Sequence, residues 1–158
     1  MHWTTHIITG AATGYLIGRP LPAALVGFAS HLALDIAPHY DPDSEIGYVV
    51  DSLVGCAALA FIATNRDMRR ADVNGAALWG AVGGALPDLE LLVNLFKDID
   101  TEEYILPWHN GTLTHRQTHI PGSTASQVAL IVVLLWLVAA KARKLGLRRA
   151  GAPAGRAG

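Results

Sequence analysis

The segment 30–39, with the sequence SHLALDIAPH, carries the clearest pattern of side chains able to do chemistry. His31 and Asp35 are four residues apart, so on a helix they lie on one face. An imidazole and a carboxylate arranged in this way can bind one metal ion. The alternative is a hydrogen-bonded pair at a polar helix end. His39 follows Pro38, which ends the helix, so it reaches the same ion only if the chain turns back. Otherwise the chain holds more than one ion.

A second group of candidate ligands lies in the segment 109–119, HNGTLTHRQTH, which has three histidines in eleven residues. His115 and His119 repeat the four-residue spacing, and we expect them to bind metal together with His109. The alternative is a polar, solvated loop. Arg116 lies beside them, and its planar guanidinium could bind a phosphate or carboxylate of a substrate, or be a plain surface charge.

A third group of candidate residues, which are acidic, lies in the segment 84–90, GALPDLE. Pro87 should kink a helix here, because proline lacks an amide hydrogen and clashes with the preceding turn. Asp88 would lie at the depth expected for Asp35, which makes it a candidate ligand or general base. The alternative is an ordinary carboxylate at a helix end. Glu90 points to another face of a regular helix, so we expect it behind the ligands or acting as a base.

His6 follows two threonines that suit the N-cap of a first helix, and we expect it to join the other ligands. The donor types favour zinc or another divalent transition metal, as one, two or more ions. Asp51 is expected in the first turn of its own helix, in a structural role. The predicted catalytic residues are Asp88, Glu90 and Arg116. The predicted metal ligands are His6, His31, Asp35, His39, Asp88, His109, His115 and His119.

The apolar segments predict an all-α, membrane-embedded bundle of about five helices. The segments 46–64, 72–96 and 124–140 suit membrane spans. Gly18-Arg19-Pro20 interrupts the first forty residues, so we predict a hairpin of two short helices, 4–18 and 21–36, instead of one long span. Helices of about 15 residues reach only about 22 Å, so they must tilt, thin the bilayer or end inside it. A buried hairpin in a soluble helical protein is the alternative.

Charge predicts the orientation of this bundle. Of the thirteen acidic residues, only Asp67 and Asp72 fall on the side that carries most of the basic residues, which the positive-inside rule makes cytoplasmic. We therefore expect a multi-pass protein of the inner (cytoplasmic) membrane, with a cytoplasmic C-terminus and the metal site toward the outside. The basic residues on the cytoplasmic side are Arg19, Arg66, Arg69, Arg70, Lys141, Arg143, Lys144, Arg148 and Arg149.

Composition limits the remaining possibilities. The 158 residues suit one helical membrane domain over 1–149, followed by a disordered, low-complexity tail over 150–158. Charged residues make up 16% of the chain, against about 25% in soluble domains. A formal charge of −1 and the lack of a basic stripe argue against a nucleic-acid partner. The sequence contains no nucleophile elbow, phosphate loop or dinucleotide fingerprint.

Taken in order, these motifs resemble a known family. Thr-His near the N-terminus, Ser-His-x-x-x-Asp-x-x-Pro-His, Leu-Pro-Asp and His-x-Gly-x-x-x-His are similar to motifs of the YdjM-type inner-membrane, metal-dependent hydrolases. That family is distantly similar to zinc-dependent phospholipase C, an all-helical fold with His-x-x-x-Asp helices around zinc. The family often has a second Asp and a His after Pro-Asp, where this chain has Glu90 and Leu91. The resemblance covers about residues 4–120 and implicates His6, His31, Asp35, His39, Asp88, His109 and His115.

Two functions are consistent with these residues. The first is a membrane-bound, zinc-type hydrolase that acts on a phosphoester or lipid-linked substrate at the outer membrane boundary, with membrane lipid as its partner. The second is a non-catalytic, metal-stabilised membrane scaffold or regulatory protein. A metal carrier would need polar groups through the whole span, and few lie at the cytoplasmic end.

Overall fold

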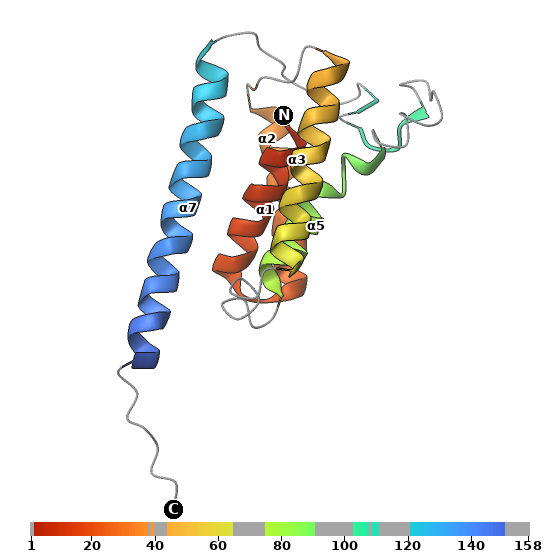
Figure 1. The fold of residues 1–158 in the computed structure, drawn as a ribbon. Coiled ribbons are helices and arrows are strands. Elements are labelled where there is room, and N and C mark those ends of the chain that lie inside the picture. Colours follow the sequence, from red (N-terminus) through yellow and green to blue (C-terminus); the bar gives the residue numbers. More distant parts are fainter. Residues whose placement is uncertain are drawn as a thin grey trace, which may run out of the picture.

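The described part of the chain is all helical. The computed structural model describes residues 2–37, 39, 44–64, 75–90, 103–107, 109–110 and 121–150, the last helix with its side chains from 125 to 144. Within these residues there are five helices and no strand, which confirms the all-α part of the predicted fold class (Figure 1). The helices are α1 (Trp3–Ile17), α2 (Pro20–Ile36), α3 (Glu45–Thr64), α5 (Ala76–Ala85) and α7 (Pro121–Ala150).

The hairpin predicted around Arg19 is present as α1 and α2. α1 ends at Gly18, which adopts a left-handed conformation with φ of 73° and donates its N–H to the carbonyl of Gly14. Arg19 is extended, and Pro20 takes the first position of α2, where a helix needs no amide hydrogen. The predicted bounds agree with the observed ones to within one residue, and a single long span is excluded.

α5 packs against both helices of the hairpin with the backbones almost in contact. A methyl group at Gly10 of α1 or at Gly27 of α2 would overlap the same carbonyl, that of Gly80. A methyl group at Gly83 would overlap the carbonyl of Ala24. Glycine, whose side chain is a single hydrogen atom, therefore sets the distance between the three helices, as at close helix crossings in membrane proteins.

α5 ends earlier than predicted. We expected one helix over 72–96 with a kink at Pro87, but α5 stops at Ala85 and residues 86–88 form a turn. Residues 72–74 and 91–96 lie outside the described part. Pro87 is fully buried and has no amide hydrogen, so the helical ladder cannot continue through it. The last carbonyls of α5, including those of Gly84 and Ala85, are thus available to side chains.

α3 lies along α1 and binds its first turn. The carboxylate of Asp51 accepts the backbone N–H of Trp3 at 2.6 Å and that of Thr4 at 3.4 Å. These amides have no acceptor within their own helix, so Asp51 caps α1. The expectation that Asp51 lies in the first turn of its own helix is wrong, because α3 already begins at Glu45. The Trp3 indole also donates to the carbonyl of Ala85 at 3.1 Å, which joins α1 to the end of α5.

α7 lies at the edge of the molecule and contacts α1 (Figure 1). The ammonium of Lys141 donates to the carbonyls of Tyr15 at 2.6 Å and Leu16 at 3.0 Å, the last turn of α1. It also lies 4.9 Å from the centre of the Tyr15 ring. A cation at a helix C-terminus satisfies carbonyls that have no other donor, so Lys141 fixes α7 to α1 at this level.

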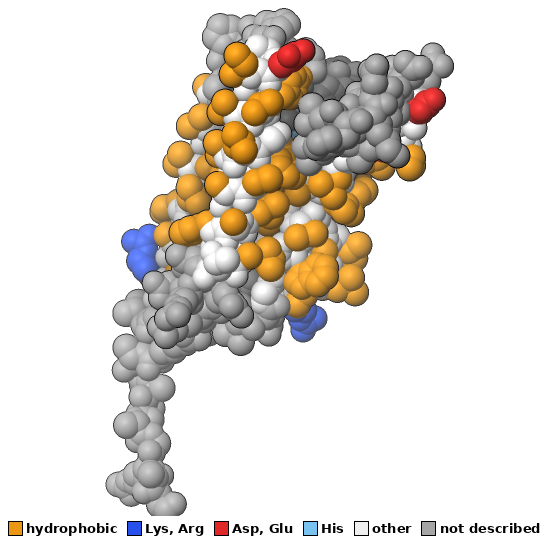
Figure 2. Space-filling view, turned by 45° about the vertical axis from the view of Figure 1, so that its right-hand side comes forward, with side chains coloured by type: hydrophobic (Ala, Val, Ile, Leu, Met, Phe, Trp, Pro, Cys, Tyr) orange, Lys and Arg blue, Asp and Glu red, His pale blue; other side chains and the backbone are white. Residues whose placement is uncertain are grey.

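Two helices are long and apolar enough to cross a membrane, over Glu45–Thr64 and Ala125–Lys144. Only 6% and 11% of these segments are buried within the protein, so their apolar side chains face outward. Figure 2 shows the resulting band of hydrophobic side chains, with acidic residues at one end of the molecule and basic residues at the other. The third predicted span, 72–96, is not one continuous helix.

Close packing at Gly10 predicts that Gly10→Ala lowers the stability of the protein by about 1–3 kcal/mol, because its methyl group must push the backbone of α5 away. The measurement is thermal or denaturant unfolding of the detergent-purified protein. Ala57→Val, on an exposed position of α3, is the control and should change little. Equal stability of the Gly10 variant and the wild type would contradict this packing.

Candidate metal centre

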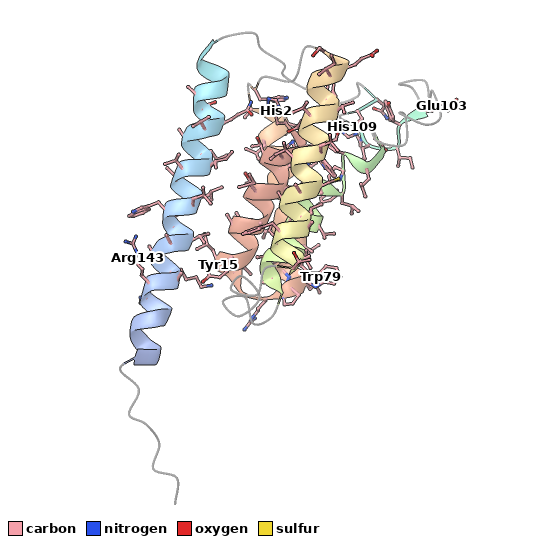
Figure 3. The ribbon with its side chains drawn as sticks, in the orientation of Figure 1. His2, Tyr15, Trp79, Glu103, His109 and Arg143 are labelled. Atoms are coloured by element: carbon pink, nitrogen blue, oxygen red, sulfur yellow. The ribbon has the colours of Figure 1, made fainter. Side chains whose placement is uncertain are left out.

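Imidazoles and carboxylates from four segments meet where α5 ends. His6 comes from α1, His31 and Asp35 come from α2, Asp88 follows α5, and His109 comes from the segment 103–110. Figure 3 places His2 and His109 toward one end of the helices, and Tyr15, Trp79 and Arg143 toward the other. Five of the eight predicted ligands thus lie together at one end.

The first group of potential ligand atoms is formed by His6, His31 and Asp35. The Asp35 carboxylate lies between the two rings, with Oδ1 3.1 Å from His6 Nε2 and Oδ2 3.0 Å from His31 Nε2. The rings stack at 3.7 Å between their centres. All three side chains are at most 3% exposed. Burying these polar groups costs free energy unless each one is paired, so their clustering calls for a physical explanation.

The ring of His31 is oriented by the backbone of α5. Its Nδ1 lies 2.8 Å from the carbonyl of Gly84, and because a carbonyl only accepts, Nδ1 carries the hydrogen. In the neutral ring, Nε2 then holds a lone pair, which faces Asp35 at 3.0 Å and Asp88 at 3.5 Å. Within the described part, Nε2 has no hydrogen-bond partner. Either a cation lies between these atoms or the ring carries a second proton. The first arrangement is that of metal-bound histidines.

The second group is formed by His31, Asp88 and His109. His109 Nε2 lies 3.4 Å from Asp88, and its Nδ1 lies 2.8 Å from Glu90. Burial by itself lowers the pKa of His109, but its hydrogen bonds with Asp88 and Glu90 and their charges prevail and raise that pKa. Glu90 therefore contacts the ring nitrogen of His109 that faces away from Asp88, a position behind a candidate ligand.

The separations in both groups suit a shared ion. Two donors that each lie about 2.1 Å from a tetrahedral ion are about 3.4 Å apart. The carboxylate oxygens lie 3.0 to 3.5 Å from the imidazole nitrogens that they face. The donor set of imidazole nitrogens and carboxylate oxygens fits zinc and other divalent transition metals. The two groups share His31 Nε2, and since one lone pair binds one ion, His31 could not serve a separate ion in each group at the same time.

The other predicted site residues are His39, His115, Arg116 and His119. His39 is fully buried with its Nδ1 2.8 Å from the carbonyl of Ala37, and it belongs to neither group. His115, Arg116 and His119 lie outside the described residues. Sequence reasoning missed the carbonyl of Gly84, which orients His31. The feature of the sequence that could have indicated this carbonyl is Pro87, three residues later, because a proline ends the helical hydrogen bonding.

No family model, curated protein or solved structure matches this chain significantly. The resemblance to the YdjM-type family therefore stays a prediction.

Because both groups contain His31 Nε2, we expect His31→Ala and Asp35→Ala each to remove bound metal. Elemental analysis of detergent-purified protein should find a transition metal in the wild type and almost none in either variant. His2→Ala is the matched control, because His2 is an imidazole of the same end that pairs with Asp51 at 3.5 Å and belongs to neither group. Unchanged metal in the His31 variant would show that the centre is assigned wrongly.

Proposed function

We propose that this protein is a membrane-embedded, metal-dependent hydrolase whose substrate is a phosphoester or a lipid-linked phosphate. The observation that carries the proposal is the position of His31 Nε2, which lies 3.0 Å from Asp35 and 3.5 Å from Asp88 while a backbone carbonyl fixes the ring from behind. An imidazole that donates its other ring N–H to a backbone carbonyl has the usual orientation of a metal-bound histidine.

The residues that would hold metal are His6, His31, Asp35, Asp88 and His109. A bound zinc-type ion would supply a water that loses its proton near neutral pH and would polarise the phosphoryl oxygen. Asp35 has an imidazole nitrogen near each of its two oxygens and is 3% exposed, while Asp88 is 13% exposed. Asp88 is therefore the carboxylate better suited to accept a proton during the reaction.

Membrane embedding is proposed from α3 and α7. Their apolar side chains point outward over Glu45–Thr64 and Ala125–Lys144, and such an apolar surface is costly in water. Ile46, Leu53 and Trp136 are 76%, 66% and 62% exposed. The basic residues Lys141, Arg143 and Lys144 at the end of the α7 segment favour the inner membrane, with this end in the cytoplasm. The metal centre would then lie toward the outer boundary, where phospholipid headgroups are within reach.

One observation favours the alternative, a metal-stabilised scaffold without catalysis. His6, His31 and Asp35 are almost fully buried, and closed sites of this kind are typical of structural zinc. Asp88 and Glu90 are 13% and 17% exposed, so the other side of the centre is more accessible. An assay of turnover decides between the two functions.

We expect the zinc-loaded wild type to hydrolyse bis(p-nitrophenyl) phosphate or phospholipid in mixed micelles. A chelator should stop the reaction, and Asp88→Asn should slow it at least about 100-fold, because a proton acceptor contributes about 10²–10⁴-fold. Release of p-nitrophenol or lipid products provides the measurement, with His2→Ala as the active control. A folded, metal-loaded wild type without turnover, whose His31→Ala variant loses metal and folding together, would support the scaffold instead.

Membrane embedding predicts that Cys56, the single cysteine, faces lipid from the middle of α3. In intact membranes a charged, impermeant maleimide should leave Cys56 unlabelled, because lipid excludes the reagent and suppresses the thiolate. Labelling should appear after detergent denaturation. The control is Ser44→Cys in a Cys56→Ala background, since Ser44 precedes α3 and is exposed. Rapid labelling of Cys56 in intact membranes would contradict a spanning α3.

A further inference from the structure

We propose that Glu90 is a positioning residue, which holds His109 at the metal centre and takes no part in proton transfer. This inference rests on the proposed metal centre but concerns a residue behind it. Oε1 of Glu90 lies 2.8 Å from His109 Nδ1 and 3.3 Å from the amide nitrogen of Leu106. Oε2 accepts the amides of Ile105 at 3.1 Å and Leu106 at 3.4 Å. Both oxygens are thus engaged by N–H donors.

The engaged oxygens make Glu90 a poor general base. A carboxylate has about four lone-pair sites, and here four contacts from three donors occupy them. To accept a proton from a water or substrate, Glu90 would have to release one of these donors. The same four contacts are well suited to hold a segment of chain in place.

Among the described residues of the centre, His109 is the one held neither by a helix nor by the turn after α5. His6, His31 and Asp35 lie on helices, and Asp88 lies in the turn directly after α5. His109 comes from the segment 103–110, which is tied internally by His109 N to the carbonyl of Leu106 at 2.9 Å and by Asn110 to that of Tyr104 at 3.1 Å. Glu90 connects this segment to the end of α5.

Glu90 also determines which nitrogen of His109 faces the metal. A carboxylate accepts the Nδ1 hydrogen, so the Nε2 lone pair of the neutral ring points toward Asp88. Histidines that bind metal usually donate their other N–H to such an acceptor, and loss of the acceptor weakens metal binding about 10–100-fold. His31 would be unaffected by the loss of Glu90, because a backbone carbonyl orients its ring.

The experiment compares Glu90→Gln, His109→Ala and the double variant. Cobalt(II) affinity, from competition with a chelator, should fall about 10–100-fold in each single variant, and the cobalt absorption spectrum should change. The double variant should bind no more weakly than His109→Ala, because Glu90 acts only through His109. Glu103→Gln, an exposed glutamate of the same segment, is the control and should match the wild type. Additive losses, or an unchanged affinity in Glu90→Gln, would overturn the proposal.

A second measurement does not depend on metal. In the metal-free protein, at a pH above the raised pKa of His109, the ¹⁵N shifts of its ring should report a hydrogen on Nδ1 in the wild type and a mixture of tautomers in Glu90→Gln. The same tautomer in both proteins would overturn the role of Glu90. A wild type that binds no cobalt but shows this tautomer change would refute the metal centre and keep the positioning role, so the two failures are distinguishable.

Discussion

The site depends on the close approach of α5 to the helical hairpin. At Gly10, Gly27 and Gly80 the three backbones pack with no side chain between them, and even a methyl group would overlap a carbonyl oxygen. The donors of the centre are 3.0 to 3.5 Å apart, a range that leaves little room for a shift of any one helix. The smallest residues of the chain therefore fix the geometry of the candidate metal centre. The packing of α5 against the hairpin therefore also sets the distances between the donor atoms.

The end of α5 links this packing to the chemistry. In a continuous helix the amide of Asp88 would bond the carbonyl of Gly84. Because Pro87 ends the helix, that carbonyl receives His31 instead, while the next carbonyl, that of Ala85, receives the indole of Trp3. The same turn directs Asp88 toward His31, at 3.5 Å. Pro87 thus leaves the Gly84 carbonyl free to orient His31, and it forms the turn that brings Asp88 close to the same ring.

Contacts between residues close together in the sequence could be predicted from it, and contacts between residues far apart could not. The pairing of His31 with Asp35 follows from helical spacing, and the hairpin follows from glycine and proline at the break. The end of α5 differs from the predicted kink because a proline can bend a helix or stop it, and tertiary packing decides which. The helix start predicted at 46 was nearly right, but the role of Asp51 was not, because it caps α1, a helix far away in the sequence. Nothing local shows that Glu90 would bind the ring of His109, nineteen residues away.

The charge of the cluster argues that it binds cations. Asp35, Asp88 and Glu90 supply three negative charges, and with His6, His31 and His109 neutral the cluster carries a net charge of −3 next to apolar helices. Such uncompensated charge is expensive to bury, so protons or metal ions must enter. One divalent ion reduces the charge to −1, and two bring it to +1. The Nδ1 hydrogens of His31 and His109 are held by Gly84 and Glu90. A metal ion bound here would displace protons from Nε2 of His31 and His109, so its binding would compete with acid while the supporting hydrogen bonds stay in place.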